Sequence, residues 1–345
     1  MKTRLTTFLR DLQAHRLPDA QRTETVFRAI MNGELTAAQI AAVLMGLSVL
    51  GENADVITGA ARAMRAAAVR IRPKCEGLLD TCGTGGDGAS TFNISTTVAF
   101  VASACGVPVA KHGNRAISSK SGSADVLEAL GVNIDLEPEQ VCRCIEQIGI
   151  GFLFAPSHHP AMRHAGAVRR ELGVRTVFNL LGPLTNPAGA PFQVLGVYAE
   201  DRLEPVAEAL KQLGTRRALV VHGADGLDEI TTTTITHAML VEKDAPLQRF
   251  ELDPAAFGMP YATPEALAGG DAATNAAIIR HILAGQHGAG RDIVLLNTAA
   301  ALWITGKADG IPAGLELAAQ AIDSGRALEK LQALADISQT MRSRR

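Results

Sequence analysis

The stretch "DTCGTGGDGASTFNIST" at residues 80–96 decides the interpretation of this sequence. It places four glycines and several small hydroxyl side chains directly after the apolar pair Leu78–Leu79. Glycine inside a regular element costs roughly 0.5–1 kcal/mol relative to alanine, so a cluster of this density needs a cause. One interpretation is a flexible loop. The other is an anion site, in which backbone N–H groups converge on phosphate because no Cβ blocks the approach.

The residues that follow this glycine-rich loop favour phosphate. The loop is not a Walker A motif, because no Gly-Lys-Ser/Thr closes it, and "GTGGDG" matches the dinucleotide fingerprint only loosely. However, "NIST" at 93–96 opens an apolar stretch of helical character. A helix N-terminus preceded by hydroxyl groups offers free N–H donors and a positive dipole end to an anion. The alternative is that Ser95 or Thr96 is a plain N-cap.

A second polar loop follows the next predicted strand. "KHGNRAISSKSGSAD" at 111–125 contains the cations Lys111, Arg115 and Lys120 among serines and two glycines. Such a loop can hold a highly charged anion, although a solvated charged loop would have the same composition. Because the two loops follow two successive strands and each precedes a helix, together they predict a polyphosphate site.

Acidic residues follow a later apolar strand. "VVHGADGLDEITT" presents Asp225, Asp228 and Glu229. Adjacent carboxylates that face a pyrophosphate would hold Mg²⁺, which prefers carboxylate, water and phosphate oxygens. An exposed acidic turn is the alternative interpretation of this stretch alone.

The organisation of the chain predicts an α/β fold class. Residues 1–72 show helical spacing and no strand signal, which indicates a small N-terminal all-helical domain. From about residue 77, short apolar strands alternate with helices, which predicts a larger α/β domain with a mainly parallel central sheet flanked by helices. We expect parallel strands at 77–81, 107–111, 151–155, 192–198 and 217–223, a small antiparallel section at 231–252, and helices from Asn275 onward.

Composition excludes several classes of protein. Of the 345 residues, 47% are apolar, and no run approaches the ~20 apolar residues that span a bilayer. The N-terminus lacks a secretory apolar region. The net charge of −2 argues against a general nucleic-acid binder. The five cysteines are odd in number and follow neither zinc nor disulfide spacing, so we expect a cytoplasmic protein with free thiols.

These motifs together resemble the anthranilate phosphoribosyltransferase family. The resemblance rests on "GTGGDG", "NIST", the second loop, "GLDEI" and the long stretch at 154–188, "FAPSHHPAMRHAGAVRRELGVRTVFNLLGPLTNPA", and it covers nearly the whole chain. It implies a helical domain at 1–72, completed by a helical insertion near 158–180. It also implies an α/β domain at 73–157 and 181–345 that binds phosphoribosyl pyrophosphate (PRPP). "NLLGPLTNP" indicates a tight Pro/Gly hinge between the two.

The resemblance also implies the residues of the site. PRPP would contact Gly83, Gly85, Gly86, Asp87, Thr91, Asn93, Ser95, Thr96, Lys111, Asn114, Ser118, Ser119 and Ser123. Anthranilate would contact Gly83, His112, Asn114, Pro156, His159, Arg169 and Gly182, with Arg169 on its carboxylate. Mg²⁺ would be held by Ser95, Asp228 and Glu229. No obligatory base is assigned, because an aniline nitrogen is already neutral at pH 7; Lys111 and His112 are expected to position the reactants.

The expected reaction transfers the phosphoribosyl group of PRPP to the amine of anthranilate, with release of pyrophosphate, in tryptophan biosynthesis. The expected partners are these two substrates, without nucleic acid or membrane, and a second copy of the chain bound through the apolar N-terminal helices. Two alternatives remain at this point. One is a pyrimidine nucleoside phosphorylase-like enzyme, and the other is a non-catalytic relative that binds nucleic acid.

Overall fold

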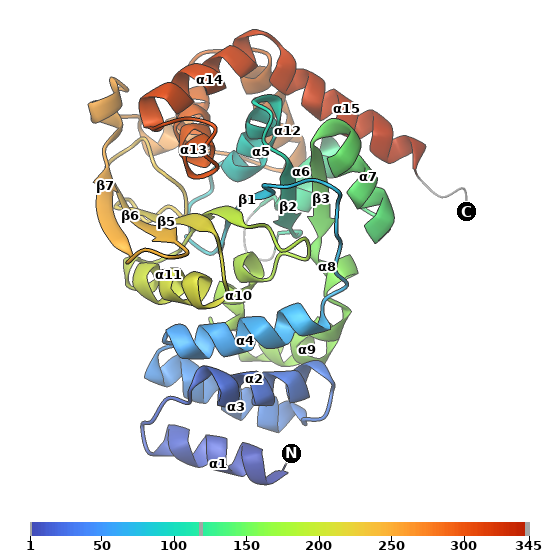
Figure 1. Cartoon of the computed structure of the whole chain (residues 1–345), viewed down its shortest axis with the longest axis vertical. Coiled ribbons are helices and arrows are strands. Elements are labelled where there is room, and N and C mark those ends of the chain that lie inside the picture. The colour runs from blue at the N-terminus through green and yellow to red at the C-terminus, as the bar shows by residue number, and fades with distance from the viewer. Residues whose placement is uncertain (1, 117–119, 342–345) are drawn as a thin grey trace.

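The computed structural model describes residues 2–116 and 120–341. Its N-terminal part is a stack of four helices, α1 (Lys2–Gln13), α2 (Ala20–Met31), α3 (Ala37–Leu50) and α4 (Ala54–Ala67), drawn in blue in Figure 1. Side chains at the N-caps fix the starts of three of them: Asp19, Thr36 and Asn53 each accept a hydrogen bond from the backbone of the first turn. Helix α9 (Arg163–Leu172) packs against α2 and α3, and α10 (Phe178–Leu184) against α4. We call these six helices the helical module.

The rest of the chain is built on one seven-stranded sheet. The strands are β1 (Leu79–Gly83), β2 (Val109–Gly113), β3 (Ile150–Phe154), β4 (Phe192–Gly196), β5 (Arg217–Gly223), β6 (Thr236–Glu242) and β7 (Gln248–Leu252). Their order is β3-β2-β1-β4-β5-β6-β7. The first five strands of this order are parallel, and β6 and β7 are antiparallel to their neighbours. The mainly parallel sheet with a small antiparallel section is therefore confirmed.

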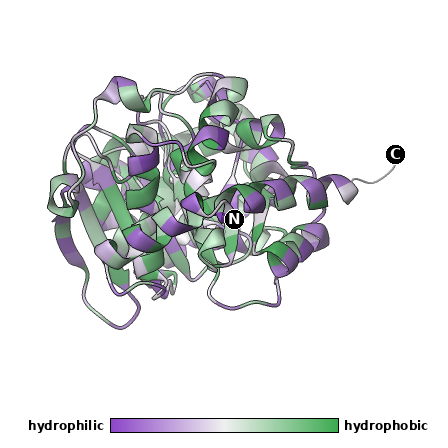
Figure 2. Ribbon diagram, turned by 90° about the horizontal axis from the view of Figure 1, so that it is seen from above, coloured by the Kyte–Doolittle hydropathy of each residue, from purple (hydrophilic) through white to green (hydrophobic). Residues whose placement is uncertain are grey.

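Helices cover both faces of the sheet (Figure 1). One face carries a large apolar core built around α5 (Ile94–Ala104) and α13 (Ala289–Ile304). The other helices of this α/β part are α6 (Ser123–Ala129), α7 (Pro138–Ile148), α11 (Leu203–Gln212), α12 (Ala272–Leu283), α14 (Ile311–Asp323) and α15 (Arg326–Thr340). In Figure 2, hydrophobic residues (green) gather along the central strands, whereas rim loops are mostly hydrophilic (purple).

The opposite face of the sheet shares a core with the helical module. Leu195 of β4 and Val220 of β5 belong to the same buried apolar cluster as Phe27 of α2 and Phe178 of α10. The rings of Phe27 and Phe178 lie 5.7 Å apart between centroids. The domain boundaries given above stay a prediction, but this continuous cluster fixes the helical module against the sheet.

Short elements complete the fold. They are α8 (Ala155–His158) and the 3₁₀ turns η1 (Pro160–Met162), η2 (Glu200–Arg202), η3 (Pro254–Phe257) and η4 (Pro264–Leu267). None of the helices within 2–116 and 120–341 combines the length and hydropathy needed to cross a membrane.

The expected Pro/Gly hinge at "NLLGPLTNP" is wrong in its local structure. Residues 178–184 form α10, and Pro183 lies inside its last turn. Pro183 has no N–H and so removes one hydrogen bond from this turn, yet the helix ends only one residue later, at Leu184. The hydroxyl of Thr185 then donates to the carbonyl groups of Leu181 and Gly182, at 3.0 and 3.1 Å, and caps the helix C-terminus. The segment is therefore helical up to Leu184 rather than a tight turn.

A close crossing of α4 over α2 gives the first prediction. A Cβ on Gly59 would lie 2.7 Å from Cβ of Thr23 and 2.8 Å from the backbone nitrogen of Glu24. We expect Gly59→Ala to destabilise the protein by ~1–3 kcal/mol, because the helices must move apart. Gly166→Ala is the matched control, since its Cβ would meet only the end of Arg170 at 3.7 Å. Alanine favours helix, so the control should be neutral or stabilising. Equal urea midpoints for the two variants would contradict the packing argument.

Candidate active site

The site forms where the order of the parallel strands reverses. From β1 the chain proceeds to β2 and β3 on one side, and β4 lies on the other side of β1. Ligands of open α/β sheets bind at the carboxyl ends of the strands beside such a reversal. The glycine-rich loop leaves β1 there and meets the end of β4: the N–H of Thr84 donates to the carbonyl of Gly196 at 2.9 Å, and the N–H of Tyr198 donates to Oγ1 of Thr84 at 3.1 Å.

The acidic pair after β5 closes over the same loop. The N–H of Gly85 donates to Oδ2 of Asp228 at 2.6 Å, and the N–H of Ser95 donates to Oε1 of Glu229 at 3.2 Å. A Cβ on Gly83 would lie 2.7 Å from Cγ of Asp228, so no larger residue fits there while that carboxylate keeps its place. The glycine-rich loop, the start of α5 and the acidic pair thus meet at one point.

The electrostatics of this point favour a cation. Burial, followed by the charge of Asp87, raises the pKa of Asp228 to about 7. Burial, followed by the charge of Asp228, raises the pKa of Glu229 to about 8. Burial also raises the pKa of Asp87, which hydrogen-bonds to Asp228. Three carboxyl groups are therefore held together with less solvation than their charges require.

This arrangement fits a magnesium ion that the protein coordinates only in part. The donors are carboxylate oxygens and the Ser95 hydroxyl, which are ligands that suit a hard cation. No group of three His, Cys, Asp or Glu side chains within the described ranges forms a complete metal site. Mg²⁺ usually keeps waters and takes substrate phosphate oxygens beside one or two carboxylates, so an incomplete set is what it needs. Asp225 is not part of it, because the hydroxyls of Thr231 and Thr233 both donate to its Oδ2.

Lys111 brings a buried positive charge to the start of α5. Its side chain is 3% exposed, and Nζ donates to the carbonyl of Thr81 at 2.5 Å and to Oγ of Ser95 at 3.2 Å. Burial lowers the pKa of Lys111, and the nearby charge of Asp80 opposes that shift. Neither Ser95 nor Thr96 is the N-cap of α5, since that residue is Asn93 and its side chain makes no capping bond. The plain N-cap interpretation is therefore wrong.

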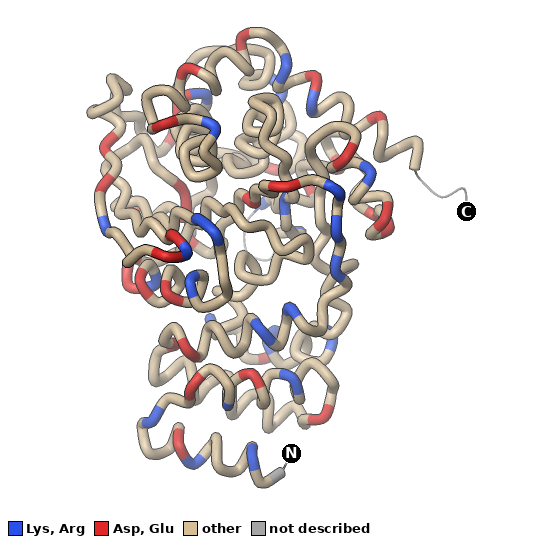
Figure 3. Tube along the Cα trace, in the orientation of Figure 1, with Lys and Arg blue, Asp and Glu red and all other residues tan. Residues whose placement is uncertain are grey.

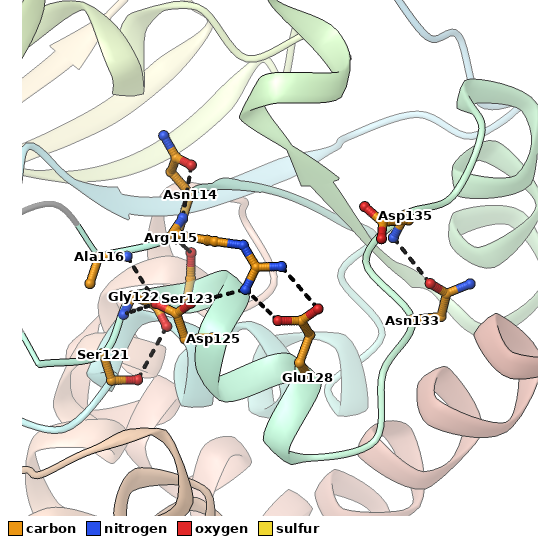
Figure 4. Close-up of polar contacts among 10 residues, drawn as sticks. All are labelled: Asn114, Arg115, Ala116, Ser121, Gly122, Ser123, Asp125, Glu128, Asn133 and Asp135. Atoms are coloured by element: carbon orange, nitrogen blue, oxygen red, sulfur yellow. Dashed lines mark hydrogen bonds and ion pairs between the residues drawn. The ribbon is translucent and has the colours of Figure 1, made fainter.

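The second polar loop is held in shape by Asp125, as Figure 4 shows. Oδ2 of Asp125 accepts from the N–H groups of Ala116 and Gly122 at 2.9 and 2.8 Å. Arg115 pairs with Asp125 and Glu128, so this cation is largely neutralised within the loop. The carbonyl of Asn114 accepts from the Ser123 hydroxyl at 3.3 Å. The predicted ligands Ser118 and Ser119 lie outside the described residues.

The remaining predicted ligands lie at the rim of the phosphate region. The side-chain amide of Asn93 donates to the carbonyl of Ser121 at 3.2 Å, and its Oδ1 accepts from Asn275 at 3.0 Å. Thr91 pairs with Ala268 in an isolated bridge. Thr96 is 1% exposed, and its hydroxyl has no partner among the described residues. The Asn93 side chain thus joins the second loop to α12, whereas the Thr96 hydroxyl is left without a partner among the described residues.

A cluster of neutral imidazoles lies on the sheet face toward the helical module. Nδ1 of His112 donates to the carbonyl of Gly182 at 3.1 Å, and the rings of His112 and His159 are 5.1 Å apart. Burial lowers the pKa of His112 to about 3 and that of His159 to about 4. Both Nε2 atoms are buried without a partner among the described residues, so each is a free hydrogen-bond acceptor. Gly182, whose carbonyl accepts from His112, is exposed, and so is Pro156 in α8.

Asp80 supports this cluster, and it was not predicted from the sequence. Its carboxylate accepts from the N–H of His112 at 3.1 Å and from the amide of Asn186 at 2.8 Å. Asn186 also donates to the carbonyl of Ala110 at 2.8 Å. The signal that was available is an aspartate within the apolar strand "LLDTC", because a charge in a buried strand requires partners.

Arg169 is a partly buried cation without a carboxylate partner in the described chain. Its guanidinium lies over the ring of Phe178, 5.2 Å from the centroid, and burial lowers its pKa. No Asp or Glu of the described ranges forms an ion pair with it. A guanidinium held on an aromatic face and left unpaired can bind the carboxylate of a ligand.

Comparison with known proteins identifies the family. Residues 76–328 match the model of the glycosyl transferase family, a/b domain, and residues 6–68 match its helical bundle domain. The chain is 55% identical to anthranilate phosphoribosyltransferase of Acetivibrio thermocellus, covering 88% of this chain and 87% of the relative. It is 54% identical to that of Citrifermentans bemidjiense, covering 92% and 94%. The chain belongs to the anthranilate phosphoribosyltransferase family.

Solved structures agree with this assignment. The enzyme of Thermus thermophilus superposes with a TM-score of 0.90 at 45% identity, covering 96% of this chain and 99% of that one. The Saccharomyces cerevisiae enzyme, in complex with PRPP and Mg, gives a TM-score of 0.90 at 27% identity, covering 99% of both chains. The expected family and the fold class of an N-terminal helical part plus an α/β part are therefore confirmed.

The raised pKa values give a prediction about stability. The pKa of Glu229 is raised in the folded protein, so its uncharged form stabilises the fold at low pH, and this contribution is lost as pH rises toward about 8. Without divalent metal, we expect wild type to lose stability relative to Glu229→Gln between about pH 5 and pH 8. The slope should be at most ~1.4 kcal/mol per pH unit.

Urea unfolding at several pH values in a chelator measures this difference. The exposed Glu316 provides the control, and Glu316→Gln should follow wild type at every pH. A difference between wild type and Glu229→Gln that stays constant over this pH range would contradict the electrostatic account.

Proposed function

We propose that the protein transfers the 5-phosphoribosyl group of PRPP to the amine of anthranilate, and releases pyrophosphate. The observation that carries this proposal is the meeting of the glycine-rich loop, Lys111 and the Asp228–Glu229 pair at the strand reversal. Family membership supports the same reaction. The relatives named above are transferases rather than phosphorylases, and the "TrpD" label of the Thermus enzyme agrees with a step in tryptophan biosynthesis.

In this proposal PRPP lies across the carboxyl ends of β1 and β2. Its pyrophosphate would bind the backbone N–H groups of the glycine-rich loop and the N-terminus of α5. The glycines of the loop have no Cβ atoms that would block this approach. Lys111 would neutralise charge from the buried side. The PRPP ligands that we propose are Gly83, Gly85, Gly86, Asp87, Thr91, Asn93, Ser95, Thr96, Lys111, Asn114 and Ser123.

Mg²⁺ is the proposed cofactor, held by Ser95, Asp228 and Glu229. Support comes from the crowding of Asp87, Asp228 and Glu229, whose pKa values are all raised. It also comes from the yeast relative, whose structure is in complex with PRPP and Mg. The ion would supply positive charge to the leaving pyrophosphate. The N–H of Gly85 donates to the carboxylate of Asp228, so this N–H of the loop already binds a negatively charged group.

The acceptor would lie on the other side of β2, beside the imidazole cluster. Arg169 is the proposed partner of the anthranilate carboxylate, because it is a partly buried cation with no acid of its own in the described chain. His112, held by Gly182 and Asp80, would line the subsite with His159, Gly83, Asn114, Pro156 and Gly182. A structure of the yeast enzyme in complex with 4-fluoroanthranilate supports an aromatic acid as the acceptor.

The chemistry demands alignment and charge neutralisation more than proton abstraction. The amine lone pair forms the N–C1 bond, and the C1–O bond breaks with its electron pair moving to pyrophosphate. The nitrogen then loses one proton to water. His112 is neutral with a folded pKa of about 3, so it orients the acceptor as a hydrogen-bond partner rather than a charged acid. Most of the rate enhancement would come from orientation and from positive charge on the leaving group.

The test is the fluorescence of anthranilate mixed with protein, PRPP and Mg²⁺. We expect the fluorescence to fall only when all three are present, and EDTA to prevent the change. No loss in a sample that binds PRPP by calorimetry would contradict the acceptor assignment. Absence of PRPP binding would contradict the whole proposal.

Arg169 separates the two substrates in this assay. Arg169→Ala should raise KM for anthranilate by roughly 10–100-fold, as expected for loss of a charge-assisted hydrogen bond. KM for PRPP should change little. The exposed neighbour Arg170 on α9 is the matched control. A normal KM for anthranilate in Arg169→Ala would remove this residue from the subsite.

We also propose that the active form is a cytoplasmic homodimer joined through the helical module. Exposed apolar residues form a stripe along α3: Ala38, Ala42 and Val49 are exposed, and Met45 between them is half-buried. Val49 is 76% exposed, which is unusual for a large apolar side chain at the end of a helix.

The proposed compartment and substrates agree with two further features. The five cysteines are all free, which suits a reducing compartment. Acidic and basic residues are interspersed over the molecule (Figure 3), which suits small-molecule substrates better than nucleic acid.

Light scattering after size exclusion tests the dimer. Wild type should have twice the chain mass of 36.2 kDa. Ala42→Glu should shift the protein toward one chain mass, because the new charge would be buried in the interface. Ala313→Glu on the exposed side of α14 is the control and should leave the mass unchanged. A wild-type protein of a single chain mass at micromolar concentration would contradict the proposal.

A further inference from the structure

Arg175 joins the helical module to the glycine-rich loop. It lies in the link between α9 and α10, and its Nη2 donates to the carbonyl of Gly86. Its own carbonyl accepts from the hydroxyl of Ser48 on α3 at 3.1 Å. A single residue therefore contacts both the helical module and the loop after β1. No local signal in the sequence marks it, since "GVRT" resembles any exposed link.

An aromatic ring holds this guanidinium in place. It lies 4.4 Å from the centroid of Tyr198, which is within the range of cation–π attraction. Tyr198 is in turn tied to the loop, because its N–H donates to Oγ1 of Thr84 at 3.1 Å. Arg175 and Tyr198 thus contact the loop at two nearby points, Gly86 and Thr84. No carboxylate in the described parts of the chain forms an ion pair with Arg175, so its charge is uncompensated there.

The charges around the loop give this cation a role. Asp87 belongs to the loop, Asp228 and Glu229 accept from the N–H groups of Gly85 and Ser95, and Lys111 is a buried cation beside Ser95. Arg175 is a cation on the exposed side of the same loop. Backbone N–H groups bind phosphate only if the loop keeps them pointed at it, and a donor fixed on the Gly86 carbonyl orients the peptide unit on that side. Gly86 has a left-handed φ of 79°, which glycine adopts without strain, so the loop has conformational freedom that the contact from Arg175 restricts.

We propose that Arg175, stacked on Tyr198, is a positioning residue that orients the glycine-rich loop for the diphosphate of PRPP. This inference rests on the proposed function, and it assigns to the helical module a direct part in binding the phosphoribosyl donor. Arg175 is bound to Ser48 of α3, and Arg169 lies on α9, which packs against α3. The helical module therefore supports both the PRPP subsite and the anthranilate subsite. PRPP affinity then depends on how the helical module meets the loop.

Pyrophosphate is the probe that separates positioning from general stability. It contains the diphosphate that the loop would hold, and it lacks the ribose and the acceptor. Arg175→Ala should raise KM for PRPP and the inhibition constant of Mg-pyrophosphate by a similar factor, roughly tenfold. KM for anthranilate and the melting temperature should stay close to wild type. Arg175→Lys should recover part of the loss, because lysine keeps the charge but not the planar stack.

Variants of Tyr198 provide an independent test. Tyr198→Phe should behave as wild type, because the stack uses the ring and not the hydroxyl. Tyr198→Leu should raise both pyrophosphate-dependent constants in the same direction as Arg175→Ala. Arg170→Ala, which removes an exposed cation on α9, should change neither.

Three results would overturn the inference. The first is an Arg175→Ala protein with unchanged constants for PRPP and pyrophosphate. The second is a loss that affects anthranilate equally or follows a fall in melting temperature. The third is a Tyr198→Leu protein that matches wild type. A wild-type protein that binds neither PRPP nor pyrophosphate would instead contradict the proposed function itself.

Discussion

The close approach of Asp228 to two strand-end glycines is the constraint on which the site depends. A Cβ on Gly196 would lie 2.9 Å from Cα of Asp228 and closer still to its carbonyl group, and a Cβ on Gly83 would lie 2.7 Å from its Cγ. Asn297 of α13 fixes the next turn of this segment, because it exchanges hydrogen bonds with both backbone groups of Ile230 at 3.0 and 2.7 Å. The core helix α13 therefore determines where the acidic pair meets the phosphate loop.

This constraint concentrates negative charge at a point that must receive a negatively charged substrate. The carboxyl groups of Asp87, Asp228 and Glu229 all have raised pKa values, mainly through burial, so the fold without ligands holds them at a cost. Cations approach from two directions, Lys111 through the sheet and Arg175 from the helical module. A divalent ion with a diphosphate would satisfy the carboxylates and the backbone donors together, which explains why an arrangement unfavourable to the protein alone is suitable for the substrate complex.

Local signals were enough to predict the strands of the sheet and the helical N-terminal part. The parallel strands lie within about two residues of the expected ranges, and the first 72 residues contain helices α1 to α4 without a strand in the part that is described. Strands β1 and β2 end at Gly83 and Gly113, two residues later than expected. The expected ranges ended too early because glycine and His112 resemble loop residues, yet they pair in the sheet. Helix α10 was missed, since "GP" usually ends a helix. The contacts Asp80–Asn186 and Arg175–Gly86 join residues 106 and 89 positions apart, and no local pattern contains them. The assignments of individual ligands remain predictions.

Titration calorimetry of PRPP with and without Mg²⁺ tests the central claim most directly, namely that the loop and the acidic pair form one site for a metal-bound diphosphate. The account predicts that PRPP and Mg²⁺ each bind weakly alone and that each strengthens the other, by the same factor in both orders of addition. It also predicts that this mutual effect is lost when Asp228 and Glu229 are changed together to Asn and Gln. Equal PRPP affinity with Mg²⁺ and with EDTA would contradict the account.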